Sequence, residues 1–179
     1  MLTIGRARIE LCLGDITQQD TEAIGNAANA KLAGGGGVDG ATHSAGGPSL
    51  MAQLKARYPE GCPTGQAVIT GGGRLKATFV IHAVGPVYAG KPHDATLLAS
   101  AYRSSLEICS RHGITSVAFP SISTGAYGYP VQEAAPIRGG ARTRVQASPC
   151  RPIENPPSRE TSSSAWSSGA SLSERVIAA

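Results

Sequence analysis

Gly25-Asn-Ala-Ala-Asn-Ala-Lys-Leu-Ala-Gly-Gly-Gly-Gly-Val-Asp-Gly-Ala-Thr-His-Ser-Ala45 is the stretch of sequence that decides the fold. It follows an apolar segment, passes through four consecutive glycines, and continues into a predicted helix that carries Asp39 and His43. Glycines let backbone N–H groups approach an anion closely, and a helix N-terminus adds further N–H donors. The stretch therefore predicts a diphosphate-binding loop with chemistry beside it. A flexible linker is the alternative, although such linkers usually contain only Gly and Ser.

The composition indicates one globular domain. With 179 residues, of which 41% are hydrophobic, the chain is long enough to bury a sizeable core. No apolar run reaches membrane-spanning length, and the first residues lack the pattern of a signal peptide. The four cysteines are widely spaced: Cys12, Cys62, Cys109 and Cys150. We therefore expect a cytoplasmic protein with reduced thiols, no metal site and no membrane association.

The positive charge is concentrated near the C-terminus. The net charge is +4, but residues 1–137 hold ten Lys or Arg against nine Asp or Glu, which gives +1. Residues 138–179 hold six Arg against three Glu, which gives +3. The body of the chain is thus not basic, and the tail lacks aromatic residues interleaved with its arginines. A nucleic-acid partner is not expected.

Hydrophobic periodicity predicts strands that alternate with helices, which is typical of a layered α/β domain. The predicted strands are 8–13, 23–27, 66–70, 78–84 and 117–120. The predicted helices are 38–46, 49–57 and 94–112, and a short helical stretch begins near Val131. Asp94 is the expected N-cap of the long helix, and Gly113 is placed to end it.

The composition changes abruptly near Arg138. From there the chain is rich in Arg, Pro, Ser and Gly and has no sustained helix or strand period. We therefore predict a domain over residues 1–137, followed by a mostly disordered tail over 138–179. Within this tail, one or two helical turns are expected only over 172–179.

A second loop suited to anion binding runs from Pro120 to Pro130. It follows a predicted strand, which is the position where α/β sheets bind ligands. Ser121, Ser123 and Thr124 supply hydroxyls, and Gly125 and Gly128 allow close backbone approach. An ordinary turn rich in Ser and Gly is the alternative. Paired with the four glycines, this loop predicts the other side of a phosphate clamp.

Five motifs follow one another along the chain: Gly14–Thr17, Asn26–Asn29, Gly34–Gly40 with His43, Val80–Pro86 and Ile122–Pro130. Together they resemble the macrodomain family, specifically its MacroD-type ADP-ribose hydrolases. The resemblance extends over about residues 9–137. It implies an α/β fold with three α/β/α layers and a mixed central sheet. The C-terminal helix, strand and closing helix of the family have no match here, so we expect them to be missing or replaced.

The resemblance also implies where ADP-ribose binds. The ligand is expected in a cleft above the C-terminal strand ends, with Asp15 and the Ile16 backbone at the adenine amino group, and Asn29 and Asp39 at the distal ribose. The two Gly-rich loops are expected to hold the phosphates. The implied ligand-binding residues are Asp15, Ile16, Asn26, Gly35, Gly36, Gly37, Val38, Ser123, Thr124, Gly125, Ala126 and Tyr127. No cofactor is expected.

The implied reaction is hydrolysis, either removing mono-ADP-ribose from acidic side chains or deacetylating O-acetyl-ADP-ribose. Such a reaction needs an oriented water and a group that takes its proton. Asp39 is the candidate, with Asn29 and His43 as further catalytic residues, while a substrate phosphate oxygen is an alternative proton acceptor. Each candidate also has a structural interpretation: Asp39 and Asp15 as caps, His43 as a packed helix residue, and Asn26 as a partner of backbone groups.

Two residues depart from the family pattern. Gly25 stands where a β-branched residue is usual and should soften its strand, and Thr42 replaces an apolar residue. His82 alternates within an apolar strand and is interpreted as a hydrogen-bonded core residue. Besides the hydrolase, two other functions remain open: a non-catalytic module that binds ADP-ribose, and an inactive chain destabilised by its atypical C-terminus.

Overall fold

A mixed seven-stranded sheet forms the middle of the described part of the chain, which comprises residues 2–4, 7–140 and 175–178 of a computed structural model. The strands are β1 (Leu2–Ile4), β2 (Ala7–Leu11), β3 (Ala23–Ala27), β4 (Ala67–Gly71), β5 (Phe79–Ala83), β6 (Ser116–Phe119) and β7 (Arg175–Ala178). Their order in the sheet is β1-β2-β7-β6-β3-β5-β4. The outer pairs β1–β2 and β4–β5 are antiparallel, and the four inner pairings are parallel.

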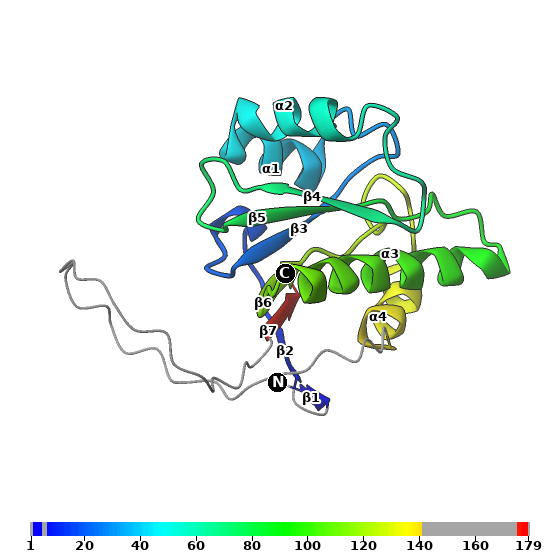
Figure 1. Ribbon diagram of the computed structural model, residues 1–179. Coiled ribbons are helices and arrows are strands. Elements are labelled where there is room, and N and C mark those ends of the chain that lie inside the picture. Colours follow the sequence, from blue (N-terminus) through cyan, green and yellow to red (C-terminus); the bar gives the residue numbers. More distant parts are fainter. Residues whose placement is uncertain (1, 5–6, 141–174, 179) are drawn as a thin grey trace.

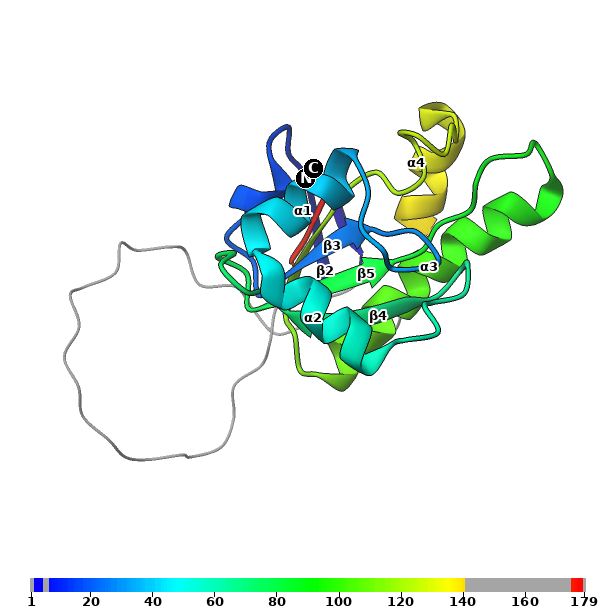
Figure 2. The ribbon, with the colours of Figure 1, turned by 90° about the horizontal axis from the view of Figure 1, so that it is seen from above.

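Helices cover both faces of this sheet (Figures 1 and 2). The helices α1 (Gly37–Gly46) and α2 (Pro48–Arg57) pack on one face, against β3 and β4 respectively. The long helix α3 (Pro92–Arg111) packs on the other face against β4 and β5, and α4 (Val131–Gly140) packs on α3. A short 3₁₀ helix, η1 (Ile16–Gln18), contacts α1. The three α/β/α layers predicted from the sequence are confirmed.

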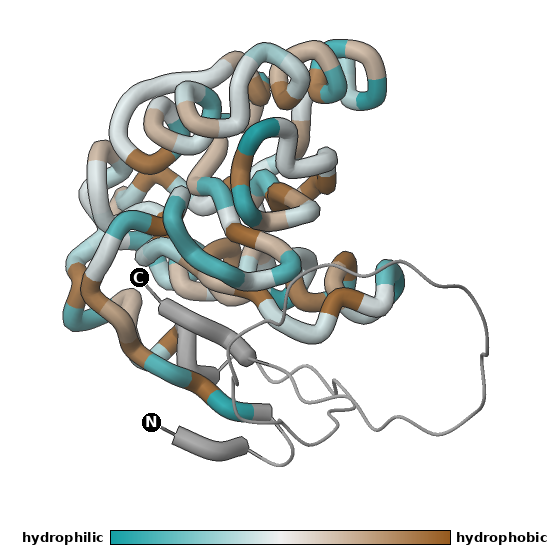
Figure 3. The backbone as a smooth tube through the Cα atoms, turned by 90° about the vertical axis from the view of Figure 1, so that its left-hand side faces the viewer, coloured by the Kyte–Doolittle hydropathy of each residue, from teal (hydrophilic) through white to brown (hydrophobic). Residues whose placement is uncertain are grey.

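Alternation along the strands divides the core between the two faces. Ile24 and Val80 pack with Leu50 of α2 in one buried cluster. Ile81 and Phe119 belong to the cluster on the opposite face, which also contains Leu98, Tyr102 and Ile108 of α3. The hydropathy of strand β2, which lies between β1 and β7, also has a period of two, and its tube alternates between teal and brown in Figure 3. This alternation decides which side chains of β3 and β5 face α1.

The predicted strands and helices are present, with two differences. The N-cap of α3 is Lys91 rather than Asp94, because the helix begins at Pro92, a residue that is favoured in the first turn. Asp94 instead lies at the third helical position, where its Oδ2 accepts hydrogen bonds from the N–H groups of Ala89 (2.8 Å) and Lys91 (3.1 Å). The carboxylate therefore closes a capping box across the start of the helix.

The second difference concerns the C-terminus. The helical turns expected over 172–179 are wrong for Arg175–Ala178, which form strand β7 between β2 and β6. Parallel ladders on both sides satisfy its backbone groups, so pairing overrides the weak local signal. A strand is thus present in the region where the sequence offered no match. Residues 141–174 lie outside the described part, and their predicted disorder and the domain boundary near 137 stay predictions.

Gly25 has a steric reason to be glycine. A Cβ at this position would lie 2.5 Å from Cδ1 of Phe119, the buried aromatic side chain of the neighbouring strand β6. The Phe119 ring thus covers the strand where a β-branched side chain would stand. Despite the glycine, β3 spans all five predicted residues.

We predict that Gly25→Val lowers the free energy of unfolding by about 1–3 kcal/mol, because the added side chain overpacks the core against Phe119. Urea denaturation followed by circular dichroism measures the change. In the Phe119→Leu background, which removes part of the ring, the same substitution should cost less. An equal cost in both backgrounds would contradict the steric explanation.

Candidate functional site

A cleft of about 300 Å³ lies where the chain leaves three neighbouring strands, β3, β5 and β6. Residues that follow these strands form its walls together with the start of α1. The lining residues are Ala27, Ala28, Asn29, Gly35, Gly36, Gly37, Val38, Asp39, Gly85, Ser121, Ser123, Gly125, Ala126 and Tyr127. Because α/β domains bind ligands at this end of a sheet, the cleft is the candidate site.

The N-terminus of α1 opens into the cleft. The helix begins at Gly37, and its N-cap Gly36 provides no side-chain hydrogen bond to the first turn. The N–H groups at the start of a helix have no partner within the helix, so these groups are available to an anion. Gly40 allows the preceding loop to fold back onto α1, because a Cβ there would lie 2.7 Å from the Gly35 carbonyl oxygen.

The loop after β6 forms another wall. Its Ser123 has a φ of 67°, a left-handed conformation that residues with a side chain rarely adopt. The buried Oγ of Ser123 has no hydrogen-bond partner among the described residues. Backbone strain and an unsatisfied buried hydroxyl are costly, and both are typical of segments that bind a ligand.

Asp39 is the carboxylate of the cleft, and two side chains hold it. Asn26 Nδ2 donates a hydrogen bond of 2.6 Å to Asp39 Oδ1, and His43 Nε2 lies 3.4 Å from the same oxygen. Asp39 and His43 are four residues apart, which places them on one face of α1. The other oxygen, Oδ2, lies beside Gly35, where an added Cβ would be only 3.2 Å away. One carboxylate oxygen is thus fixed by the protein, and the other lies at the glycine loop.

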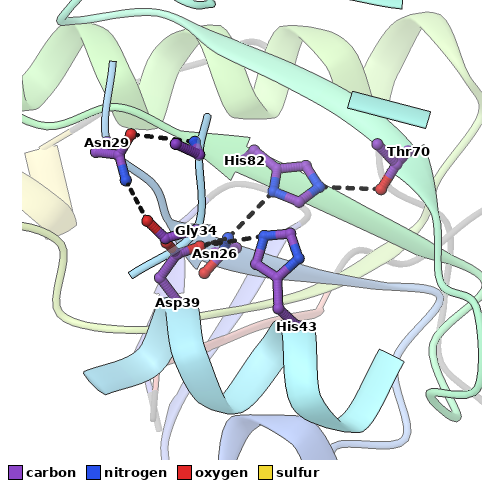
Figure 4. Close-up of polar contacts among 8 residues, drawn as sticks. Asn26, Asn29, Gly34, Asp39, His43, Thr70 and His82 are labelled. Carbon is purple, nitrogen blue, oxygen red and sulfur yellow. Dashed lines mark hydrogen bonds and ion pairs between the residues drawn. The ribbon is translucent and has the colours of Figure 1, made fainter. Parts of the chain in front are cut away.

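A buried polar chain continues behind Asn26 (Figure 4). Asn26 Nδ2 lies 3.1 Å from His82 Nδ1, and His82 Nε2 lies 2.9 Å from Thr70 Oγ1. Burial and, to a smaller extent, the charge of nearby His43 lower the pKa of His82 to about 3. His82 is therefore neutral at physiological pH. Its Nδ1 accepts from Asn26, so its Nε2–H donates to Thr70.

The strand register assembles this chain. In the parallel pair β3–β5, Asn26 lies opposite His82. Both residues share a sheet face with Ile24 and Val80, the face that α1 covers. Both side chains are fully buried. The interpretation of His82 as a hydrogen-bonded core residue agrees with this arrangement, and its partner proves to be the residue that holds Asp39.

Asn29 lines the cleft and organises the loop before α1. Its Nδ2 donates to the Gly34 carbonyl oxygen at 2.8 Å, and its Oδ1 accepts from the Ala33 N–H at 3.3 Å (Figure 4). An amide nitrogen carries two hydrogens, so one N–H of Asn29 remains for a ligand. Asn29 thus shapes the glycine loop from within the cleft wall.

Asp15 caps the short helix η1. Its Oδ1 accepts hydrogen bonds from Thr17 N at 2.9 Å and from Thr17 Oγ1 at 2.8 Å. The backbone hydrogen bond, followed by the hydroxyl bond, holds the pKa of this carboxyl below its usual range. Ile16 is buried in the core. The capping alternative for Asp15 is thus present, and its contact with adenine stays a prediction.

The cleft gathers most of the predicted site residues. Those among its lining are Asn29, Gly35, Gly36, Gly37, Val38, Asp39, Ser123, Gly125, Ala126 and Tyr127. Five predicted residues are outside the lining: Asp15, Ile16, Asn26, His43 and Thr124. Of these, Asn26 and His43 contact Asp39 and act on the cleft through it.

Ser121, one of the hydroxyls predicted in the loop after β6, also lines the cleft. Three residues of the cleft wall were not predicted: Ala27, Ala28 and Gly85. Each directly follows a strand or lies within two residues of its end. Gly85 also belongs to the motif that ends at Pro86, and a Cβ there would lie 2.2 Å from Ser123 Oγ. Position at the strand ends was therefore a signal that could have identified these residues.

Comparison with known proteins decides the family. The family model described as Macro domain matches residues 25–138. The chain belongs to the macrodomain family. A macro domain-containing protein of Caldanaerobacter subterraneus subsp. tengcongensis is 55% identical over 135 residues, which cover 74% of this chain and 77% of that protein. A protein of Cronobacter turicensis named O-acetyl-ADP-ribose deacetylase is 56% identical over 133 residues, which cover 73% and 76% of the two chains.

Solved macrodomains share the architecture described above. A mutant macrodomain of Oceanobacillus iheyensis with ADPR superposes with a TM-score of 0.77 and 34% identity, covering 99% of this chain and 88% of that one. In the described part of this macrodomain, no helix is long and apolar enough to cross a membrane. The same residues contain no group of three or more His, Cys, Asp or Glu side chains able to hold a metal ion.

We predict that the stability of this macrodomain falls as the pH is lowered from 6.5 toward 5. The pKa of His82 is lower in the folded state than in the unfolded chain, so the unfolded state binds a proton over this range and the folded state does not. The loss reaches up to about 1.4 kcal/mol per pH unit.

Urea denaturation at several pH values measures this slope. His82→Gln should have a flatter dependence over the same range, whereas His93→Gln, at a largely exposed histidine of α3, should keep the wild-type slope. Equal slopes for all three proteins would show that His82 does not titrate on unfolding.

Proposed function

We propose that this macrodomain binds ADP-ribose in the cleft and hydrolyses ADP-ribosyl esters. The substrates are mono-ADP-ribose on acidic side chains or O-acetyl-ADP-ribose. The observation that carries the proposal is the position of Asp39, a buried carboxylate at an uncapped helix N-terminus within the cleft. The relative named O-acetyl-ADP-ribose deacetylase and the O. iheyensis macrodomain with ADPR support it.

The binding part of the proposal rests on the two loops. The start of α1 presents free N–H groups and the positive end of a helix dipole, which favour a diphosphate. The loop after β6 adds the unpartnered hydroxyl of Ser123 and the exposed backbone of Gly125. Tyr127 also lines the cleft and offers a ring against which a sugar can pack. These groups fit a dianionic ligand with an apolar sugar face.

The catalytic part rests on Asp39. In the proposed mechanism, the Oδ2 side of its carboxylate orients a water molecule and takes its proton, while Asn26 and His43 hold Oδ1. The water oxygen bonds to the acyl carbon, the bond from that carbon to the ribose oxygen breaks, and the proton held by Asp39 passes to the leaving ribose oxygen, so that the products are a free acid and ADP-ribose. If the water instead attacks the anomeric carbon of an ester at that carbon, the bond from the anomeric carbon to the carboxyl oxygen breaks and the leaving carboxylate takes the proton. Asn29 acts by holding the loop through Gly34.

A module that binds ADP-ribose without hydrolysing it is the second candidate. Such a module needs the phosphate loops but not a doubly held carboxylate. Asn26 and His43 both contact one oxygen of Asp39 and fix the orientation of its carboxylate. Buried polar chains are costly unless they are fully hydrogen-bonded. A fixed carboxylate is useful to a hydrolase that must orient a water molecule, so these contacts favour the hydrolase over the binding module. We also propose a reducing, cytoplasmic setting, supported by the thiols of Cys12 and Cys62, which form no disulfide within the described part of the chain.

We predict that saturating ADP-ribose raises the melting temperature, and that Asp39→Asn retains this shift but lowers hydrolysis about 10²- to 10⁴-fold. Asparagine keeps the shape of the side chain and an oxygen for Asn26, yet it cannot take a proton. Differential scanning fluorimetry measures binding, and release of free ADP-ribose from a glutamate-modified peptide and from O-acetyl-ADP-ribose measures turnover.

Glu107→Gln, at an acid of α3 remote from the cleft lining, is the matched control and should behave as the wild type. An unchanged melting temperature would contradict the binding site. A shift with no turnover by the wild type would identify a binding module, and full turnover by Asp39→Asn would exclude Asp39 as the proton acceptor.

A further inference from the structure

An open groove of about 490 Å³ lies on the other side of the glycine loop from the cleft. The groove is bounded by that loop, by α1 and α2, and by the segment before β5. Gly35 lines both the cleft and the groove. His43, which contacts Asp39, also lines the groove. Gly35 therefore separates the groove from the Asp39 carboxylate of the candidate site.

Arg74 is the cation of this groove, and the backbone fixes its position. The backbone N–H of Arg74 donates to the Gly46 carbonyl oxygen at 3.0 Å, and the side-chain Nη2 donates to the Ser44 carbonyl oxygen at 3.5 Å. Gly47 makes room for it, because a Cβ there would lie 2.7 Å from Arg74 Nε. Gly47 has a φ of 78°, so the turn between α1 and α2 also requires glycine. The missing side chain at Gly47 thus makes the space that the Arg74 guanidinium occupies.

The guanidinium has no acidic partner in the described part of the chain. The ion pairs found there are His43–Asp39 and His93–Asp94, and no carboxylate side chain lines the groove. Met51 and Pro48 provide apolar surface beside the cation, while the glycines expose backbone groups. A groove of this composition, with an unpaired arginine, complements an extended peptide that carries a carboxylate.

We propose that the groove binds the acidic polypeptide that carries the ADP-ribose, with Arg74 pairing with a carboxylate next to the modified residue. The inference rests on the proposed function, because it needs the reacting ester at Asp39. From there the polypeptide leaves past Gly35 and His43 into the groove. The groove thus selects esters on acidic segments over the same ester on a neutral segment.

The test uses two synthetic peptides with one ADP-ribosylated glutamate, flanked by aspartates in one and by asparagines in the other. O-acetyl-ADP-ribose serves as the substrate without a peptide. The wild type should have a higher kcat/KM for the acidic peptide. Arg74→Gln should lower that value by about three- to fivefold at low salt, and leave the neutral peptide and O-acetyl-ADP-ribose unchanged. Added salt should weaken the wild-type preference because this ion pair is exposed.

Arg103→Gln, at an exposed arginine on α3, controls for the loss of one positive charge and should keep the preference. Arg74→Lys should retain part of it, and the melting temperature of each variant shows whether it folds. Two results would overturn the proposed peptide-binding role of the groove. One is an equal kcat/KM of the wild type for the two peptides, and the other is an equal loss of kcat/KM on all three substrates with Arg74→Gln.

Calorimetry separates failure of the groove from failure of the proposed function. If the wild type hydrolyses none of the substrates, the same two peptides are compared in binding. Tighter binding of the acidic peptide that is lost in Arg74→Gln would support the groove on a binding module. Equal affinities of the wild type for the two peptides would overturn only the proposed role of the groove. No affinity for ADP-ribose would overturn both that role and the proposed function.

Discussion

The hydrogen bond of 2.6 Å from Asn26 to Asp39 is the contact on which the site depends. It joins the C-terminal half of β3 to the first turn of α1, and both side chains are buried. Through this bond the sheet fixes the start of α1, and with it the N–H groups that face the cleft. A short hydrogen bond to an ionised acceptor in a buried setting is among the stronger ones that proteins form.

This bond requires a polar layer inside the core, and that layer has a cost. Asn26, His82 and Thr70 occupy positions on β3, β5 and β4 that apolar residues could fill. Asn26 Oδ1 and Thr42 Oγ1 are buried without a partner among the described residues, and each such atom costs about 1–3 kcal/mol. A core built for stability alone would avoid them. The polar pair of Asn26 and His82 serves the site, because the neutral His82 accepts one N–H of the Asn26 amide and leaves the other N–H for Asp39.

Local patterns in the sequence reach some of this structure and not the rest. The glycines, the helix that carries Asp39 and the strand ends have local signals, so the two loops of the cleft could be predicted. The partner of His82 could not, because it depends on which residue of β3 lies opposite it in β5. Strand β7 was missed for the same reason, since two neighbouring strands hold a segment with little preference of its own. The position of Arg74 in the groove could not be predicted either, because the space for its guanidinium is made by Gly47, which is far from it in the sequence.

The absence of a side chain at Gly35 links the two surfaces of the glycine loop. A Cβ there would lie 3.2 Å from Asp39 Oδ2 and 3.9 Å from Asn29 Nδ2, so any other residue would crowd the carboxylate oxygen that the protein leaves beside the loop. Glycine at this position therefore keeps an approach to Asp39 open from the cleft and from the groove. In the proposed function, the same glycine lets the loop backbone approach the diphosphate in the cleft. It also leaves room beside Asp39 for a group attached to the ligand to pass from the cleft toward the groove.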